Sequence, residues 1–218
     1  MAPRPSPSPA GVVLAGGAAR RYGGRPKGLL EVGGRRILDR VVASVAAVTG
    51  AAPLLIANDP EAPGWRPDLR TIPDVRPGSG SLGGIYTAVV AAGEGGAEAP
   101  PPPPVLCVAW DMPFVPAALL QALVDGAAAG GFDAYLPESG GRRGVEPLCA
   151  VYGPACRAAI ARRLDAGDLK AVAFHDDVRA GILPLDRVRR FGDPDVLFFN
   201  VNTPADLAEA EALWQRHA

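Results

Sequence analysis

Cysteine and histidine are scarce in this sequence, and their scarcity excludes several kinds of protein. The 218 residues include two histidines and three cysteines, namely Cys107, Cys149 and Cys156, none of them in a CxxC pair. An odd number of cysteines without metal-ligand spacing indicates neither a disulfide framework nor a cysteine zinc site. Each cysteine lies among small or apolar residues, so we expect three buried thiols in a reducing cytoplasm.

Long apolar runs and an excess of charge are absent as well. No stretch approaches the roughly 20 apolar residues of a membrane-spanning helix, and the Pro- and Ser-rich residues 1–10 contain no apolar core of a signal peptide. Lys and Arg number 22 and Asp and Glu number 23, and the resulting net charge of −1 argues against nucleic-acid binding through the overall field. We therefore expect a cytoplasmic protein without nucleic-acid or membrane partners.

Hydrophobic residues, at 48% of the chain, alternate between strand-like and helix-like patterns. Short apolar runs predict strands at 11–15, 53–57, 70–72, 105–109, 133–136 and 148–152. Apolar residues at helical spacing predict helices at 37–48, 82–92, 116–129, 154–164 and 205–215. This alternation is typical of an α/β layered sheet, in which ligands bind beyond the carboxyl ends of the strands. We expect one domain over residues 11–215 after an unstructured tail at 1–10, with Pro100–Pro104 in a surface loop.

The first predicted strand leads directly into a glycine-rich, basic segment. From Leu14 to Lys27 it reads LAGGAARRYGGRPK, and four cations fall within its last eight residues: Arg20, Arg21, Arg25 and Lys27. Glycines allow backbone amides to approach an anion closely, and a triphosphate needs such donors together with fixed positive charge. The segment matches neither the Rossmann GxGxxG pattern nor the Walker A motif. The alternative interpretation is a glycine-rich turn with a solvated basic face.

Carboxylates follow two further strands. Asp74 comes after the third predicted strand and Asp111 after the buried fourth one. A carboxylate at the edge of a sheet can hold Mg²⁺, which prefers carboxylate, phosphate and water oxygens; the alternative for Asp111 is a turn or a helix cap. His175 is typical of a surface turn, and Asp176 and Asp177 are typical of a solvated acidic turn rather than of a second metal site. No Ser-His-Asp or Cys-His constellation for nucleophilic catalysis is visible.

Five motifs occur in a distinctive order along the chain. They are LAGG with R-x-G and a lysine over 14–27, an acidic residue with a glycine-rich segment over 74–85, D-x-P at 111–113, E-P-L-x-A-x-Y at 146–152 and N-x-N-T-P-x-D-L at 200–207. Together they resemble the compact nucleotidyltransferases of the glycosyltransferase-A-like fold, and most of all the molybdenum cofactor guanylyltransferases. Tyr22 replaces the family's methionine and Ser81 its proline. The resemblance implies a single-domain, three-layer Rossmann-like α/β fold with a mostly parallel sheet.

The resemblance also assigns roles to individual residues. It implies nucleotide contacts from Leu14, Ala15, Gly16, Gly17, Lys27, Asn58, Asp74, Gly80, Leu82 and Asp111. It implies that Asp111 holds Mg²⁺ and that catalysis depends on Lys27, Asp111 and Arg21, the two cations stabilising the charge that builds on departing pyrophosphate. Asn200 and Asn202 would lie on the acceptor side, a role compatible with helix capping at Thr203-Pro204.

The implied reaction is guanylyl transfer. The terminal phosphate of molybdopterin attacks the α-phosphorus of Mg-GTP, and the products are the guanine dinucleotide cofactor and pyrophosphate. A related cytidylyltransferase, acting on molybdopterin or another phosphate acceptor, is an alternative because base selection can rest on backbone contacts. A non-catalytic nucleotide-binding module is another alternative. Transient contacts with cofactor-synthesis or molybdoenzyme partners would accompany the enzymatic role.

Overall fold

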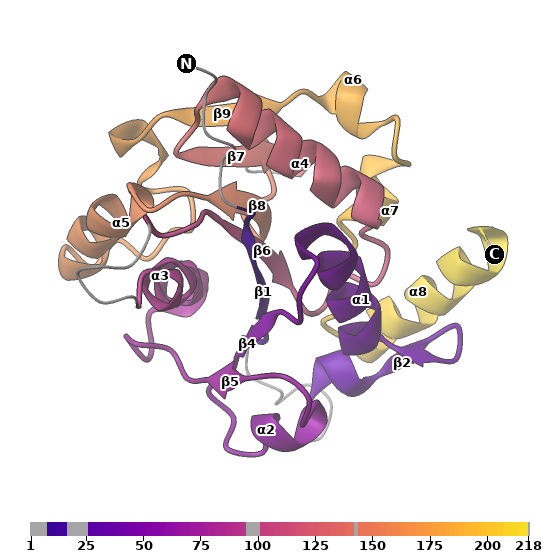
Figure 1. Cartoon of the computed structure of the whole chain (residues 1–218). Coiled ribbons are helices and arrows are strands. Elements are labelled where there is room, and N and C mark those ends of the chain that lie inside the picture. The colour runs from indigo at the N-terminus through magenta and orange to yellow at the C-terminus, as the bar shows by residue number, and fades with distance from the viewer. Residues whose placement is uncertain (1–7, 17–25, 95–100, 142–143, 218) are drawn as a thin grey trace.

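A mostly parallel sheet forms the centre of the molecule (Figure 1). The computed structural model describes residues 8–16, 26–94, 101–141 and 144–217. Within these residues, the sheet has seven strands in the order β5-β4-β1-β6-β8-β7-β9. Their bounds are β1 (Ala10–Leu14), β4 (Leu54–Ile56), β5 (Thr71–Ile72), β6 (Val105–Ala109), β7 (Ala134–Pro137), β8 (Cys149–Tyr152) and β9 (Ala180–Leu183). β8 runs antiparallel to its neighbours β6 and β7, and the other pairs are parallel.

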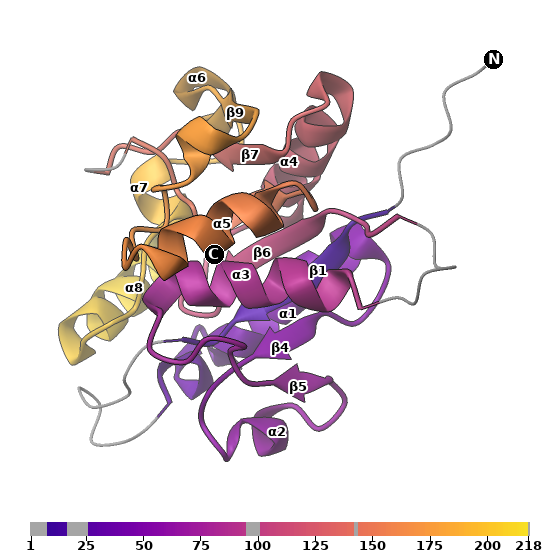
Figure 2. The same ribbon diagram turned by 90° about the vertical axis from the view of Figure 1, so that its left-hand side faces the viewer.

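Helices cover both faces of this sheet and give the molecule three layers. α1 and α4 pack on one face, and α3 and α5 lie side by side on the other (Figure 1 and Figure 2). The longer helices are α1 (Ile37–Thr49), α3 (Gly80–Ala92), α4 (Ala117–Gly130), α5 (Cys156–Asp165) and α8 (Pro204–His217). The short elements are η2 (Lys27–Leu29), the hairpin strands β2 (Glu31–Val32) and β3 (Arg35–Arg36), α2 (Ala62–Trp65), η3 (His175–Asp177), α6 (Leu185–Val188) and α7 (Pro194–Leu197).

The central strands are apolar on both sides because helices bury both faces. In β1, Val13 joins the core beneath α1 and α4, whereas Val12 and Leu14 join the core beneath α3 and α5. All five residues of β6 are buried. Strands of this kind carry continuous apolar runs rather than alternating ones. The polar side chains are consequently excluded from the strands and gather in the loops beyond their carboxyl ends.

The observed fold confirms the expected three-layer α/β architecture. Each of the six expected strands and five expected helices is present, with bounds shifted by two residues or fewer. The hairpin β2-β3, the edge strand β9 and the single-turn helices have no counterpart among the expected elements. Strands of two residues and single helical turns are too short to produce a periodic pattern. None of the described helices is both long and apolar enough to span a membrane.

Two predictions about individual side chains have different outcomes. The three cysteines are buried as expected, and burial raises the pKa of the Cys156 thiol to about 12. His175 lies in a turn, η3, as expected, but its ring is half-buried and packs edge-on against Phe174, with centroids 4.9 Å apart. Asp177 of the same turn is exposed, and it pairs with Arg163 of α5 at 2.9 Å.

Candidate functional site

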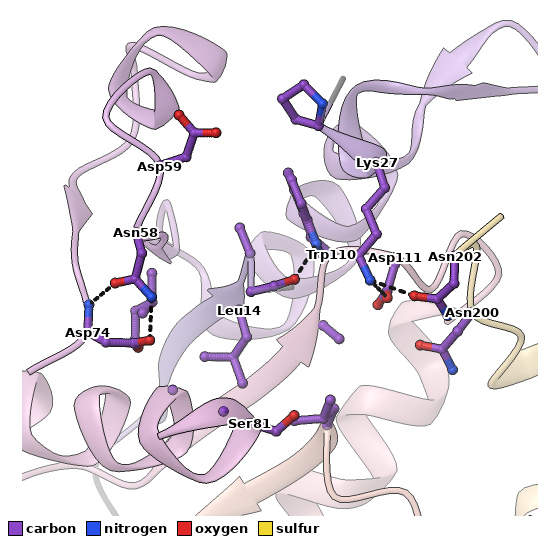
Figure 3. A pocket seen from close by; sticks show the side chains of 18 of the residues that line it. Leu14, Lys27, Asn58, Asp59, Asp74, Ser81, Trp110, Asp111, Asn200 and Asn202 are labelled. Atoms are coloured by element: carbon purple, nitrogen blue, oxygen red, sulfur yellow. Dashed lines mark hydrogen bonds and ion pairs between the residues drawn. The ribbon is translucent and has the colours of Figure 1, made fainter. Parts of the chain in front are cut away.

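The carboxyl ends of the central strands border a pocket of about 930 Å³ (Figure 3). Pockets of this size are typical of sites for small-molecule ligands and cofactors. The loops after β1, β4, β5 and β6 contribute to its lining, together with the start of α3 and the segments before β8 and α8. Ten residues expected at the site line this pocket: Leu14, Ala15, Gly16, Lys27, Asn58, Asp74, Gly80, Asp111, Asn200 and Asn202.

Lys27 and Asp111 meet on one side of the pocket. Lys27 is the first residue of η2 and Asp111 follows β6. The ammonium of Lys27 forms an ion pair with Asp111 Oδ2 and donates a hydrogen bond to Asn202 Oδ1 at 2.8 Å. The side chains of Lys27 and Asp111 are only 14% and 9% exposed, so solvent screens their charges weakly. The site therefore presents a cation that is held by two oxygens at the edge of the sheet.

Asp111 has a second carboxylate oxygen with a different environment. Oδ1 is buried and has no hydrogen-bond partner among the described residues. A buried polar atom without a partner costs free energy unless a ligand or an ion satisfies it. The backbone oxygen of Asp111 accepts a hydrogen bond from Val201 N at 3.0 Å, which ties the asparagine segment before α8 to the end of β6. The carboxylate of Asp111 thus has one oxygen that no described residue engages and that a ligand could use.

Asn58 and Asp74 form a second polar group on the opposite side of the pocket. Asn58 Nδ2 donates to Asp74 Oδ2 at 2.6 Å, and Asp74 N donates to Asn58 Oδ1 at 2.8 Å. Thr87 of α3 accepts a hydrogen bond from Val75 N at 3.0 Å and so holds the loop that carries Asp74. Leu14 lies between this pair and the Lys27–Asp111 pair (Figure 3). The pocket therefore has two polar ends and an apolar middle.

The asparagines before α8 are held by the start of that helix. Asp206 Oδ2 accepts hydrogen bonds from the backbone N of both Asn202 and Thr203, each at 2.8 Å. Asp206 N in turn donates to Thr203 Oγ1 at 3.2 Å. This reciprocal arrangement satisfies backbone donors at a helix start, and it confirms the expected cap at Thr203-Pro204. Asn200 Nδ2 donates to Phe198 O at 2.8 Å.

Among the described residues, one that was expected at the site lies away from the pocket. Leu82 is fully buried in the core beneath α3 and α5 and is not part of the lining. Adjacent residues of a helix face different directions, and in α3 Ser81 is exposed whereas Leu82 faces the core. The glycine-rich motif alone does not show which of the two faces the pocket. Gly17 and Arg21 lie outside the described residues.

The pocket also contains residues that the sequence did not single out as site residues. Trp110 lines it and stacks on Trp65, with ring centroids 5.0 Å apart and planes inclined by 18°. Glu146 lines it too, and its Oε1 accepts a hydrogen bond from Leu148 N at 3.0 Å. Only their positions in the sequence could have indicated these two residues: Trp110 directly precedes Asp111, and Glu146 begins the E-P-L motif.

Comparison with known proteins identifies the family. The profile of the MobA-like NTP transferase domain matches residues 11–178. The chain belongs to this family. MobA-like transferases with whole-length similarity to it include the "Probable molybdenum cofactor guanylyltransferase" of Pelotomaculum thermopropionicum, which is 36% identical over 203 residues, 93% of this chain and 92% of the relative.

Two further comparisons agree with this membership of the MobA-like family. The molybdenum cofactor guanylyltransferase of Desulfosudis oleivorans is 34% identical over 204 residues, covering 93% of this chain and 94% of the relative. The crystal structure of molybdopterin-guanine dinucleotide biosynthesis protein A from Archaeoglobus fulgidus superposes with a TM-score of 0.76 at 26% identity. That match covers 95% of this chain and 99% of the archaeal one. The chain is therefore a nucleotidyltransferase of the MobA-like family over nearly its whole length.

Proposed function

We propose that this chain is a molybdenum cofactor guanylyltransferase, which transfers GMP from Mg-GTP to the terminal phosphate of molybdopterin. A phosphate oxygen of the acceptor attacks the α-phosphorus and forms a new P–O bond. The bond from the α-phosphorus to the bridging oxygen breaks, and pyrophosphate leaves. The cluster of Lys27, Asp111 and Asn202 beside the pocket carries this proposal. The names of the most similar relatives support the same substrates.

The residues present fit a magnesium ion at Asp111. Mg²⁺ takes one or two protein carboxylates and completes its shell with phosphate and water oxygens. Asp111 supplies a buried carboxylate whose Oδ1 has no partner among the described residues. The amide oxygen of Asn202 is close by, because it contacts the same Lys27 ammonium as Asp111 Oδ2. Asp111 would hold the ion, with Asn202 beside it. When bound, Mg²⁺ neutralises phosphate charge and makes the α-phosphorus more electrophilic.

Lys27 stabilises the charge that develops on the leaving group. Asp111 and Asn202 hold its ammonium at the pocket, where the phosphates of a bound nucleotide would lie close to it. Nucleotidyl transfer requires little covalent chemistry from the protein, because the acceptor phosphate is itself the nucleophile. Gly16 follows β1, and no other described residue lies within 4 Å of where its Cβ would be, so its backbone can approach a phosphate closely. Positioning and electrostatics are thus the contributions of this chain.

The pair of Asn58 and Asp74 fits recognition of the guanine base. Guanine presents a ring N–H and an exocyclic amine side by side, and one carboxylate can accept from both. Asp74 is half-buried, and its hydrogen bonds with Asn58 orient its carboxylate at the end of the pocket opposite Lys27. Cytosine offers a single amine donor next to an acceptor nitrogen, which a carboxylate would repel. This pair therefore favours GTP over CTP.

The experiment that tests the function compares nucleotides directly. Purified protein is incubated with molybdopterin, Mg²⁺ and GTP, CTP or ATP, and pyrophosphate and the dinucleotide product are measured. We expect turnover with GTP and little with CTP or ATP. A preference for CTP would retain the reaction type and contradict guanine selectivity. Binding of GTP without pyrophosphate release in the presence of molybdopterin would contradict the catalytic role.

Ligand-induced stabilisation gives a simpler first measurement. A ligand at about 100 times its dissociation constant raises the free energy of unfolding by roughly 2.7 kcal/mol. For a domain of this size the unfolding midpoint should rise by roughly 5–10 °C. We expect this shift with Mg-GTP and a smaller one with Mg-CTP. Equal shifts with both nucleotides would contradict the role given to Asp74.

A further inference from the structure

Trp110 is a large, buried side chain at the pocket with no role in the chemistry described above. It follows β6 directly and is only 2% exposed. Its indole Nε1 donates a hydrogen bond to Gly16 O at 3.3 Å, and its ring stacks on Trp65. Its backbone N donates to Leu14 O at 3.1 Å. A buried indole requires an acceptor for its N–H, so the hydrogen bond and the stacked face together determine the orientation of this ring.

Gly28 packs against the same ring from the other end of the glycine-rich segment. A Cβ atom built on Gly28 would lie 2.2 Å from Trp110 Cε3 and 2.7 Å from Cδ2. Contacts this short do not occur between real atoms, so only glycine fits at this position. Gly28 is buried and directly follows Lys27 along the chain. The indole of Trp110 therefore determines how closely the backbone at Lys27 approaches the end of β6, where Asp111 begins.

These contacts converge on one consequence for the reaction. We propose that Trp110 is a positioning residue, which holds Gly16 and Gly28 on its indole and thereby keeps the Lys27 ammonium at Asp111 and Asn202. This role rests on the proposed function, because it acts through the charge that Lys27 supplies to departing pyrophosphate. Displacement of a catalytic group by about 1 Å can reduce a rate by as much as 10²-fold. A side chain that takes no part in the chemistry can therefore limit turnover.

The test replaces Trp110 by phenylalanine and measures steady-state kinetics with GTP. Trp110→Phe keeps an aromatic ring beside Gly28 but removes the N–H that bonds Gly16. We expect kcat to fall on the order of tenfold, with the KM for GTP within about twofold of wild type, because Lys27 acts mainly in the transition state. Gly28→Ala adds a methyl group that would collide with the Trp110 ring, and it should lower kcat in the same way. Trp214→Phe makes the same substitution on α8, at an indole that is not part of the pocket lining, and it should leave kcat close to wild type.

A double-mutant cycle separates positioning from a general loss of stability. If Trp110 acts through Lys27, then adding Trp110→Phe to Lys27→Ala should reduce kcat little beyond the effect of Lys27→Ala alone. Single-turnover assays with radiolabelled GTP make the slow variants measurable. Multiplicative effects of the two substitutions would overturn the proposal. So would an unchanged kcat in Trp110→Phe, or an equal loss in Trp214→Phe. Failure of the proposed function is recognised separately, because the wild-type protein would then release no pyrophosphate from GTP.

Discussion

Lys27 bridges two oxygens, Asp111 Oδ2 and Asn202 Oδ1, that also suit a divalent cation. The ammonium and a metal ion would therefore compete for overlapping positions. A bound nucleotide would relieve this competition, because its phosphates would provide further oxygens for both the ammonium and the metal. Under the proposed function, Lys27 would therefore couple metal binding to nucleotide binding. Two predictions follow from the same three side chains, one on turnover and one on metal affinity.

Asp111→Asn should abolish most of the turnover and leave the fold intact. The substitution keeps the shape of the side chain and removes the negative charge that holds Lys27 and fits a metal ion. Losing one electrostatic element of a transition state typically costs about 10²- to 10³-fold in kcat. Product formation and the circular dichroism spectrum are the measurements. Asp125→Ala, at an exposed position on α4, is the matched control. Turnover near wild type in Asp111→Asn would contradict the role of this carboxylate.

Lys27→Ala should bind Mn²⁺ alone more tightly than the wild-type chain does. Removal of the ammonium frees Asp111 Oδ2 and Asn202 Oδ1 and eliminates repulsion between two cations. An increase in affinity on the order of tenfold is expected for a charge a few ångströms away in a partly screened site. Titration of free Mn²⁺ by electron paramagnetic resonance measures it without turnover. Lys27→Arg, which keeps the charge, serves as the control. Equal affinities for Lys27→Ala and wild type would show that Lys27 and the metal do not compete.

Among the elements, the start of α8 holds the asparagine segment at the pocket. Asp206 caps this helix by accepting hydrogen bonds from the backbone amides of Asn202 and Thr203. The backbone N of Val201 donates a hydrogen bond to the backbone O of Asp111. The cap therefore holds the asparagine segment against the end of β6. Helix capping and the placement of Asn202 in the pocket lining are two consequences of the same hydrogen bonds.

Asp206→Ala should lower both stability and activity. Loss of a helix cap costs about 1 kcal/mol, so the midpoint of chemical denaturation should fall accordingly. The backbone of Asn202 would also lose a hydrogen bond, and we expect the KM for the acceptor to rise while GTP binding changes little. Urea denaturation and steady-state kinetics with each substrate varied separately measure the two effects. An unchanged KM for molybdopterin, together with the expected loss of stability from the missing cap, would limit Asp206 to a structural role.

The elements that were predicted from the sequence are those with strong periodic patterns. β1 and β6 are continuous apolar runs, and α1 ends at Gly50, which adopts the left-handed conformation that glycine favours at a helix end. The hairpin β2-β3 has strands of two residues each and could not be recognised by periodicity. For the site, charged motifs after the strands indicated Lys27 and Asp111. Trp110 was missed because its role depends on packing against Gly28, which no local pattern encodes.

The whole molecule has an apolar core on each side of one sheet, and the turn η3 packs against the core beneath α3 and α5. Phe174 is fully buried in the core beneath α3 and α5, and the ring of His175 packs edge-on against it. His175 Nε2 is buried without a hydrogen-bond partner among the described residues. Burial lowers the pKa of His175 below its ordinary value of 6.5, although the charge of Asp176 opposes this effect. The stability of the fold should therefore depend on the protonation of this residue.

Lowering the pH through the ordinary pKa of histidine should destabilise the wild-type chain more than a His175→Gln variant. Below pH 6.5 the unfolded chain binds a proton on this residue, whereas folded His175 stays neutral until its own, lower pKa is reached. The unfolded state then carries more protons, so the free energy of unfolding falls as the pH falls. Urea denaturation between about pH 5 and 8 measures this dependence. His175→Gln removes the titration but retains a polar side chain, and its stability should decline less steeply over the same range. Parallel declines for the two proteins would show that His175 titrates equally in the folded and unfolded states.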